Sequence, residues 1–272
     1  MSRTLTVATW NINSVRLRID QVVRFLEEHQ PDVLCLQEIK CQDDQFPFKP
    51  LKKLGYEHVA VRGQKSYHGV AIVSRIPFLN ITHRLFYDKD DARHLEVVLD
   101  VKDGLTLHNF YVPAGGDEPD PEINEKFAHK LGFMNEMAQW YEGMALEKKK
   151  PTRMVLVGDL NVAPLVHDVW SHKDLIRVVS HTPVEVDLLG RVQSSLHWVD
   201  AMRRFVPESE KLYSWWSYRA KDWEASNRGR RLDHVWVTPD LEGNLQSMSV
   251  VKETRSWERA SDHAPVLVTL GL

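Results

Sequence analysis

Apolar residues near the start of the chain follow a strand period, then a helix period, then a continuous run. Residues 4–10 alternate between apolar and polar side chains, which is typical of a strand. From Ile19 to Leu26 apolar residues recur three and four positions apart, which predicts a helix, and Pro31 ends it. Residues 33–37 are almost all apolar, as in a strand that is buried on both faces. The chain is therefore expected to open with a β-α-β unit.

The rest of the chain combines strand-like runs with one long helical segment. Strands are predicted at residues 56–61, 69–74, 95–101 and 105–112, with Asp103-Gly104 as a hairpin turn between the last two. Residues 121–150 predict a helix, with Pro121 at its start and lysines 148–150 in its last turn. A short buried strand at 154–157 precedes a loop-rich region. Late strands are predicted at residues 213–217, 232–238, 247–252 and 265–270.

Each half of the chain contains a buried strand that leads directly into a carboxylate. Glu38 follows residues 33–37, and Asp159 follows residues 154–158. This similarity predicts two sheet layers that face each other. No segment has the composition of a linker, so residues 1–272 are expected to form a single domain of the α/β class, arranged as a sandwich.

Composition and charge narrow the classes of protein. Hydrophobic residues make up 43% of the 272 positions and charged residues 27%, which is typical of a globular protein with a sizeable core. No apolar run approaches the roughly 20 residues that span a bilayer, and the N-terminus has no signal-peptide pattern. We therefore expect a soluble, cytoplasmic protein without a membrane partner. The formal net charge of −3 neither requires nor excludes a polyanionic partner. Cys35 and Cys41 are expected to be free thiols.

Polar side chains lie at or near the ends of several of the predicted strands, where sheets present functional groups. They are Asn11 and Asn13, Glu38, Tyr111, Asp159 and Asn161, Asp233, and the pair Asp262-His263. Taken singly, Asp159, Asn161 and Asp262-His263 are equally consistent with turns, and Asp233 with a cap. Glu38 differs, because a carboxylate directly after an apolar run is costly to bury without a cation, either a metal ion or Lys40.

Together these groups suit hydrolysis of a phosphodiester. Glu38 and Asp262 are oxygen ligands with amide neighbours and no Cys/His cluster, a set that favours a hard Mg²⁺ or Mn²⁺ and hence a phosphate substrate. Asp159 beside Asn161 could orient or deprotonate water, and His263 paired with a carboxylate could hold phosphoryl oxygens. Further histidines show no ligand spacing and are expected at the surface or in the core: His58, His83, His129, His167, His172 and His197.

Six motifs in sequence order resemble the exonuclease III branch of the endonuclease/exonuclease/phosphatase superfamily. They are Trp10-Asn11-Ile12-Asn13-Ser14-Val15-Arg16, Leu36-Gln37-Glu38-Ile39-Lys40, Tyr111-Val112-Pro113, Gly158-Asp159-Leu160-Asn161-Val162-Ala163, Arg231-Leu232-Asp233 and Ser261-Asp262-His263-Ala264-Pro265. The resemblance covers nearly the whole chain. It implies a four-layered sandwich of two central mixed β-sheets flanked by helices, with the site at their shared edge.

The resemblance also implies a set of metal ligands. Glu38 would be the principal ligand of the metal, and Asp262 and Asn11 would complete or support its coordination sphere. Asp159 and Asn161 are expected beside the same ion.

For the reaction, the resemblance implies that Asp159, aided by Asn161, positions or deprotonates the attacking water. Tyr111 would contact the scissile phosphate, and His263, oriented by Asp233, would contact a phosphoryl oxygen. These five residues are the expected catalytic groups.

Substrate contacts are expected from Asn13, Arg93, Trp215, Arg228 and Leu232. In the family, the Ser-Trp motif matched by Ser214-Trp215 places its ring beside a pocket for a base-free deoxyribose, and Leu232 would belong to the same wall. Arg93 matches a family arginine that helps to hold the DNA backbone.

Residues 211–231 contain six basic residues against two acidic ones, interleaved with five aromatic rings. Such a basic and aromatic patch suits nucleic acid, because cations contact phosphates and rings stack or form an apolar wall. The residues expected to contact phosphates are Arg219, Lys221, Arg228, Arg230 and Arg231. Trp216 and Tyr218 are either core rings or part of the patch.

We therefore expect a Mg²⁺-dependent DNA repair nuclease, with Mn²⁺ able to substitute, that acts as a monomer on double-stranded DNA. It would cleave the phosphodiester 5′ to abasic sites and process 3′ ends as a 3′-5′ exonuclease and as a 3′-phosphatase or phosphodiesterase. One alternative is a phosphodiesterase or phosphatase of the same superfamily acting on a lipid or small-molecule phosphate, against which the basic patch argues. Another is an inactive DNA-binding module, against which the complete set of catalytic residues argues.

Two departures from the family pattern affect the expected substrate. Ala114 stands where the family usually has Asn or Gln, so a phosphate donor is missing unless the amides of Gly115 or Gly116 replace it. The segment 180–186 is also altered. Both leave open the balance between incision at abasic sites and processing of 3′ ends.

Overall fold

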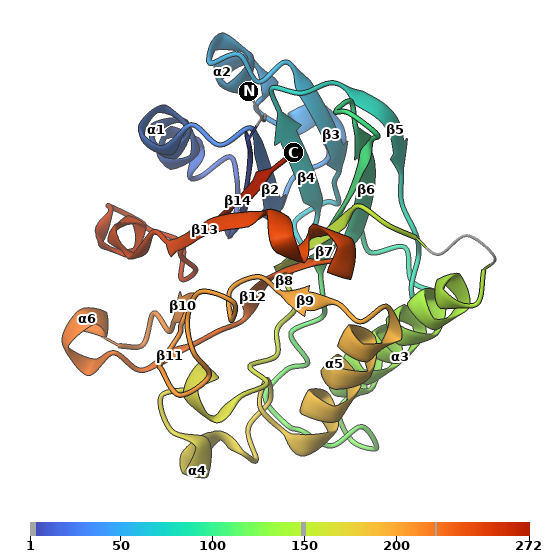
Figure 1. The fold of residues 1–272 in the computed structure, drawn as a ribbon. Coiled ribbons are helices and arrows are strands. Elements are labelled where there is room, and N and C mark those ends of the chain that lie inside the picture. The colour runs from blue at the N-terminus through green and yellow to red at the C-terminus, as the bar shows by residue number, and fades with distance from the viewer. Residues whose placement is uncertain (1–3, 148–150, 221) are drawn as a thin grey trace.

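The computed structural model describes residues 4–147, 151–220 and 222–272, and its centre is formed by two six-stranded sheets (Figure 1). The first has the order β13-β14-β1-β2-β4-β3. Its strands are β1 (Thr4–Asn11), β2 (Val33–Gln37), β3 (His58–Arg62), β4 (Val70–Ser74), β13 (Leu245–Val250) and β14 (Val266–Gly271). The second has the order β5-β6-β7-β8-β12-β9. Its strands are β5 (Phe78–Thr82), β6 (His94–Leu99), β7 (Leu105–Tyr111), β8 (Met154–Asp159), β9 (Val199–Asp200) and β12 (Asp233–Val237).

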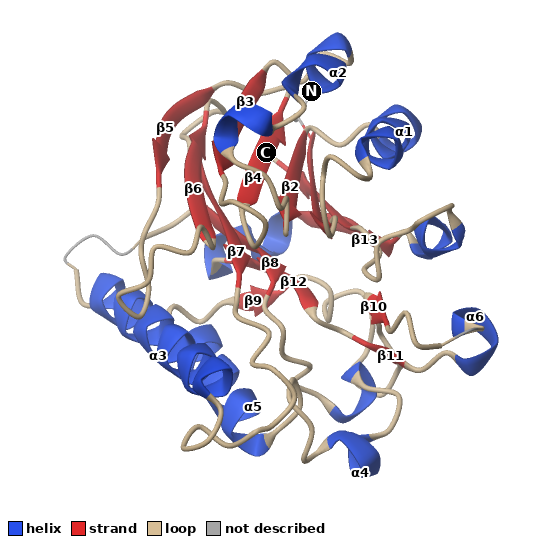
Figure 2. Cartoon of the chain, turned by 180° about the vertical axis from the view of Figure 1, so that it is seen from behind, coloured by secondary structure: helices blue, strands red, loops and turns tan. Residues whose placement is uncertain are grey.

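Helices cover the outer face of each sheet. Helices α1 (Ile19–His29) and α2 (Phe48–Lys53) lie on the first sheet, whereas α3 (Glu125–Ala145) and α5 (Pro183–Ser195) lie on the second (Figure 2). The main core lies between the sheets and consists of inward-facing aliphatic residues from both, such as Val7 and Val157. Burying these apolar faces against each other and against the helices drives the packing. The predicted four-layered sandwich is confirmed.

Both sheets are mixed, and this topology brings strand ends together. Strand β1 pairs with β2 in parallel, and β7 pairs with β8 in parallel, while the other neighbours are antiparallel. In the second sheet, Asp159 at the end of β8 pairs with Asp233 at the start of β12. The functional strand ends predicted from the sequence therefore meet at one edge of the sandwich.

Short elements connect and flank the two sheets. They are η1 (Asp43–Gln45), η2 (Val166–Asp168), α4 (His172–Leu175), β10 (Trp215–Trp216), α6 (Trp223–Ser226), β11 (Gly229–Arg230), η3 (Pro239–Asn244) and η4 (Lys252–Ser256). The predicted turn at Asp103-Gly104 is confirmed, since both residues have the positive φ of 64° and 66° that a tight hairpin requires.

Some predicted boundaries were wrong. The helix expected at 121–150 begins at Glu125, because the Asn124 side chain accepts a hydrogen bond from the Lys126 amide and caps it. It ends at Ala145, and lysines 148–150 lie outside the described residues. The strand expected at 213–217 shortens to β10.

Several elements were missed in segments that have weak apolar patterns, among them α2, α5 and β5. The region after β8 was expected to be loop-rich but contains α5, which has a capping box between Thr182 and Glu185 and a proline in its first turn. Strand β5 was missed because it is a largely exposed edge strand. Within the described ranges, no helix combines the length and apolarity needed to cross a membrane. Cys35 and Cys41 are buried and free, as expected.

Candidate active site

The candidate site is built on backbone turns that directly follow the central strands. Glu38 comes after β2, Asn13 after β1 and Asn161 after β8, and all three residues have left-handed φ values of 51°, 48° and 54°. Non-glycine residues in this region are uncommon and cluster at functional sites. These turns aim polar side chains across the edge of the sandwich.

Asn11 connects the carboxylates of the two sheets. Its side-chain Nδ2 donates to Glu38 Oε1 and to Asp159 Oδ2, both at 2.9 Å, while its Oδ1 accepts the Asn13 amide at 3.1 Å. Asn11 is fully buried, so its orientation is fixed by these partners. One amide therefore sets the spacing between the two acidic groups.

Glu38 has donors on both carboxylate oxygens. Tyr111 donates its hydroxyl to Oε1 at 2.9 Å, and Lys40 Nζ lies 2.8 Å from Oε2. Burial alone would raise the pKa of Glu38, but Lys40 and Asn11 reverse the effect and hold the pKa below its usual value. Glu38 is thus ionised at neutral pH. The sequence analysis named a metal ion or Lys40 as the cation that could offset the burial of Glu38, and the structure places Lys40 there.

His263 is held between two aspartates. Its Nδ1 lies 2.8 Å from Asp233 Oδ2, and its Nε2 lies 3.7 Å from Asp159 Oδ2. Burial would lower the pKa of His263, but Asp233 and Asp159 more than offset this and raise it above its usual value. The imidazole is therefore charged at neutral pH, with Nε2 facing Asp159. The contact with Asp233 fixes the orientation of the ring.

Asp159 and Asn161 form one rigid turn. The Asn161 amide donates to Asp159 Oδ1 at 3.0 Å, and Asn161 Nδ2 donates to Asp159 Oδ2 at 3.2 Å and to the Val112 carbonyl at 2.9 Å. Gly158 precedes them with φ of 141°, and a Cβ there would lie 2.0 Å from the Phe110 carbonyl oxygen. Burial, together with Asp233 and Glu38, raises the pKa of Asp159 despite the opposing His263. Asp159 is therefore more basic than an ordinary aspartate.

Asp262 lines the same small cavity as Asp159 and Asn161. Its Oδ2 accepts the Trp215 indole N–H at 2.9 Å, and its Oδ1 accepts Asn13 Nδ2 at 3.2 Å. The cavity, called here the site pocket, has a volume of about 250 Å³. It is lined by Glu38, Ala114, Gly116, Asp159, Asn161, Val179, Ser180, Trp215, Arg230, Leu232, Asp262 and His263.

Arg93 lies in an adjoining pocket rather than in the site pocket. This second pocket, of about 580 Å³, shares Ala114 and Gly116 with the site pocket. Arg93 pairs with Asp91, donates to the Tyr111 carbonyl at 3.3 Å and places its guanidinium carbon 4.7 Å from the Tyr111 ring centroid. It therefore borders the site from the far side of Tyr111.

The basic and aromatic patch divides into buried and exposed members. Arg231 is fully buried and pairs with Asp168 and Asp200, so its predicted contact with phosphates was wrong. Trp216 is a core ring, while Tyr218 is 53% exposed. Lys221 lies outside the described residues.

Arg228 is exposed and is not among the residues that line the site pocket. Its guanidinium carbon lies 4.7 Å from the ring centroid of Trp170, which packs in the same apolar cluster as Leu232 and Trp215.

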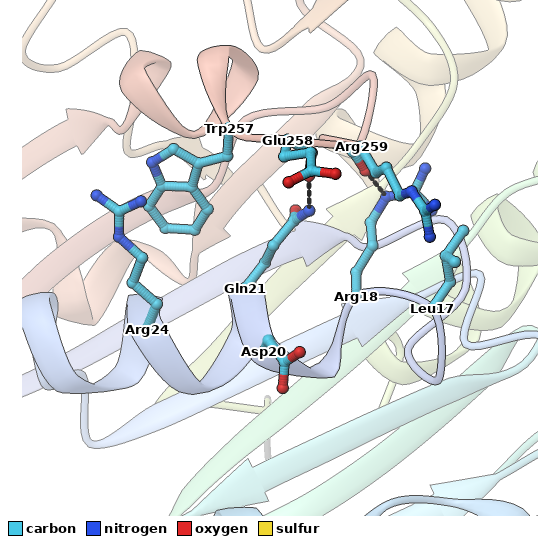
Figure 3. Close-up of a pocket in the computed structure, with 8 residues that line it drawn as sticks. All are labelled: Leu17, Arg18, Asp20, Gln21, Arg24, Trp257, Glu258 and Arg259. Atoms are coloured by element: carbon cyan, nitrogen blue, oxygen red, sulfur yellow. Dashed lines mark hydrogen bonds between the residues drawn. The ribbon is translucent and has the colours of Figure 1, made fainter.

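Residues that support the loop before Asp262 were missed in the sequence. Arg18 Nε donates to the Arg259 carbonyl at 2.7 Å, and Gln21 Nε2 donates to the Glu258 carbonyl at 2.6 Å (Figure 3). Arg24 stacks its guanidinium 4.2 Å from the Trp257 ring centroid in the same hollow of about 350 Å³. Long polar side chains recur every three residues from the residue before α1 into the helix, which could have indicated a face that contacts another segment. The sequence does not reveal that this segment is the distant loop at residues 257–259.

The donor set can hold a hard metal ion. Glu38, Asp159 and Asp262 present carboxylate oxygens to one pocket, the ligand type that Mg²⁺ prefers. Asp159, Asp233 and His263 also lie close enough together to hold an ion. In that group, however, a protonated imidazole already supplies the positive charge, so the carboxylates around the site pocket are the better metal ligands.

Comparison with known proteins places this geometry in a family. Residues 8–263 match the Endonuclease/Exonuclease/phosphatase family, to which the chain belongs. The chain is similar to exodeoxyribonuclease III of Haemophilus influenzae, with 31% identity over 95% of this chain and 97% of that protein.

Solved structures agree with this assignment. The chain is similar to an AP endonuclease from Archaeoglobus fulgidus, with a TM-score of 0.89 and 30% identity over 98% of this chain and 100% of that one. It is also similar to a 3′ phosphatase from Neisseria bound to a product DNA hairpin, with a TM-score of 0.87 and 29% identity over 98% and 100% of the two chains. The resemblance predicted from the six motifs is confirmed.

Proposed function

We propose that this chain is a Mg²⁺-dependent DNA repair nuclease that hydrolyses the phosphodiester 5′ to abasic sites and processes the 3′ ends of duplex DNA. The observation that carries the proposal is the convergence of Glu38, Asp159, Asp262 and His263 on a pocket with an aromatic wall, Trp215. The relatives named exodeoxyribonuclease III, AP endonuclease and 3′ phosphatase support the same reaction class.

The metal would be held by Glu38 and Asp262, with Asp159 and Asn161 beside it and Asn11 supporting the carboxylates. This role for Asn11 follows from its two hydrogen bonds, which go to Glu38 and Asp159. When bound, Mg²⁺ would neutralise phosphate charge and polarise the scissile phosphoryl group. Mn²⁺ has similar ligand preferences, so we propose that it substitutes.

The chain's own groups supply the proton chemistry. Asp159, with its raised pKa and its fixed contacts to Asn161, is placed to orient a water molecule and accept its proton. His263, charged and oriented by Asp233, can donate a hydrogen bond to a phosphoryl oxygen as negative charge develops there. Burial, reinforced by Glu38, raises the pKa of Tyr111 well above its usual value, so Tyr111 acts as a neutral hydrogen-bond donor.

The substrate contacts are proposed from residues at and beside the two pockets. Trp215 and Leu232, which line the site pocket, would form the apolar wall against a base-free deoxyribose. Arg93 lines the adjoining pocket and Asn13 donates to Asp262 at 3.2 Å, and both would hold the adjoining backbone. Arg228 is proposed as a more distant phosphate contact, since it is exposed on the same patch. We propose that the enzyme works as a monomer in the cytoplasm, on double-stranded DNA.

The proposal is tested by separating recognition from hydrolysis at Trp215. The variant Trp215→Ala removes the wall, so incision of a duplex with one stable abasic analogue should fall far more than hydrolysis of a simple activated phosphodiester. The matched control is Trp215→Phe, which keeps a ring but lacks the N–H that Asp262 accepts. It should keep most of the selectivity.

The outcomes distinguish the possible roles of Trp215. Equal losses on both substrates with a much lower melting temperature would assign Trp215 to the core and remove it from the pocket. An unchanged rate ratio in a stable Trp215→Ala variant would also contradict the assignment. If the wild-type protein cleaved the activated diester but no DNA substrate, the proposed function itself would be wrong.

A further inference from the structure

The site pocket is also lined by an arginine, Arg230, whose role the mechanism above does not use. Strand β11 pairs with β10 so that Arg230 lies directly across from Trp215. The Arg230 guanidinium carbon lies 5.4 Å from the Trp215 ring centroid, and both residues line the site pocket together with Leu232. The pocket that would receive the base-free sugar is therefore partly cationic.

Arg230 is fixed by residues 179 and 180, where the segment that departs from the family pattern begins. Its Nη1 donates to the Val179 carbonyl at 2.9 Å and to Ser180 Oγ at 2.7 Å. Ser180 in turn is held in place because its amide donates to both carboxylate oxygens of Glu185 at 2.9 Å. The guanidinium thus has a defined position, which a binding group requires.

The charge of Arg230 has no carboxylate partner within the described part of the chain. The adjacent Arg231 pairs with Asp168 and Asp200, whereas Arg230 has only two neutral acceptors, and its buried Nε has none. Burial lowers the pKa of Arg230, and Glu185, which pairs directly with Lys130, offsets the lowering only in part. The guanidinium nevertheless remains charged at any physiological pH. A partly desolvated charge without a counter-ion is unfavourable, and an anion would relieve the cost.

The carboxylates of the site pocket already have other partners. Glu38 pairs with Lys40, Asp159 faces His263, and Asp262 accepts two hydrogen bonds from Trp215 and Asn13. The anion that would pair with Arg230 is therefore expected to come from the substrate and not from the protein.

The position of Arg230 indicates which part of the substrate this is. The oxygen of water forms a bond to phosphorus while Asp159 accepts one of its protons, the bond from phosphorus to the 3′ oxygen breaks, and the 3′ oxygen takes up one proton, so that one water is consumed for each bond broken. The site pocket holds the group that the phosphate carries on its other side. In abasic-site incision this is a neutral sugar, whereas in a 3′-phosphomonoester it is a further anionic oxygen, since such an ester carries about −1.5 to −2 charges at pH 7.

We propose that Arg230 makes the site pocket selective for anionic 3′ termini, foremost a 3′-phosphomonoester on duplex DNA, over a neutral base-free sugar. This inference rests on the proposed function, because it assigns the preferred substrate class of the same site. Arg230 acts as a specificity-determining residue through charge-assisted hydrogen bonds, while hydrolysis is carried out by the groups already described.

The test compares matched duplexes that differ only at the lesion. One carries a recessed 3′-phosphate, one a recessed 3′-phosphoglycolate, one an internal stable abasic analogue and one a recessed 3′-hydroxyl. For wild type, Arg230→Met and Arg230→Lys, kcat/KM is measured on each. The control is Arg191→Met, which removes an exposed arginine that pairs with Glu142 on the outer helices.

We expect Arg230→Met to lower kcat/KM for the 3′-phosphate by at least about tenfold relative to abasic-site incision, the loss typical of a charged hydrogen bond. Arg230→Lys should retain part of the preference, and Arg191→Met should retain all of it. A matching loss on the 3′-phosphoglycolate would extend the selectivity to carboxylate-bearing termini, and no such loss would restrict it to phosphomonoesters.

Two results would overturn the inference. One is an unchanged ratio of 3′-phosphate to abasic-site activity in Arg230→Met, and the other is a ratio that shifts toward the 3′-phosphate. Inhibition by inorganic phosphate, the product of 3′-phosphate hydrolysis, gives a second measurement that does not require rates on all four duplexes. Its inhibition constant should rise at least several-fold in both Arg230 variants, and equal inhibition of wild type and variants would contradict the role. Failure of wild type on every DNA substrate would instead refute the proposed function.

Discussion

Lys130 and Glu185 form an ion pair behind the active site, and both side chains are fully buried. Lys130 Nζ also donates to the Asn161 carbonyl at 2.7 Å and to the Ala114 carbonyl at 3.3 Å. Glu185 accepts hydrogen bonds from the Ser180 amide and from the Thr182 amide and hydroxyl. The pair therefore ties three loops of the site pocket to helices α3 and α5.

Removing one partner should be strongly destabilising. Lys130→Met keeps most of the side-chain volume but leaves the Glu185 carboxylate buried without its cation, which costs about 3–5 kcal/mol of unfolding free energy. In Glu185→Gln the remaining amine can lose its proton, because burial already lowers the pKa of Lys130. That variant should lose less, about 1–3 kcal/mol, the penalty of an unsatisfied buried polar group. The double variant should be more stable than the sum of the two losses predicts, since neither charge is left alone.

The unfolding free energies of wild type, Lys130→Met, Glu185→Gln and the double variant are measured at pH 7 by urea unfolding, which is followed by tryptophan fluorescence. The control, Arg191→Met, breaks an exposed pair with Glu142 and should cost less than about 1 kcal/mol. On the folded fraction, Lys130→Met should also lower kcat, because the Asn161 and Ala114 loops lose their common donor. A Lys130→Met cost below about 1 kcal/mol, or strictly additive losses in the cycle, would refute the assigned role.

Three further predictions concern the chemistry and the buried histidines. Asp159→Asn should bind DNA but lose on the order of 10²–10⁴-fold in turnover, and retention of more than about a tenth of the wild-type rate would exclude it as the base. Glu38→Gln should recover activity partly at raised Mg²⁺ or with Mn²⁺, so an unchanged metal dependence would show that Glu38 is not a ligand. Burial lowers the pKa of His108 to about 3, so the unfolded chain takes up a proton there that the native state does not. Stability should therefore fall as the pH drops from about 6.5 toward 3, and His108→Asn should reduce this slope by up to about 1.4 kcal/mol per pH unit, which urea midpoints between pH 7 and 4.5 would reveal.

Several of the proposed catalytic residues could be located from the sequence because they lie at the ends of strands with strong apolar patterns. Runs such as β2 and β8 fix where the strands end, and the polar residue after each end is then placed at an edge of a sheet. The contacts between these residues could not be derived from the pattern alone. Asn11, for example, connects Glu38 and Asp159, which belong to different sheets, and this depends on how the sheets pack.

The basic patch marks the limit of sequence reasoning. Arg230 and Arg231 are identical neighbours, yet one lines the site pocket and the other is buried with Asp168 and Asp200. Extended backbone alternates its side chains, so opposite faces could be expected. Which arginine faces the pocket is set by the pairing of β11 with β10, and two-residue strands have no apolar pattern that reveals it.

Buried polar residues between the sheets explain how a site divided between them keeps its geometry. Gln37 Nε2 donates to Asn109 Oδ1 at 2.7 Å, and Asn109 Nδ2 donates to the Leu36 and Ala71 carbonyls, both at 3.0 Å. Apolar faces alone tolerate small shifts of one sheet against the other, whereas these directional bonds do not. Gln37 directly precedes Glu38, and Asn109 lies two residues before Tyr111. The network therefore fixes the offset of the two sheets next to the point where Tyr111 and Glu38 make their 2.9 Å contact, and this gives a functional reason for placing amides in a core that apolar residues could fill.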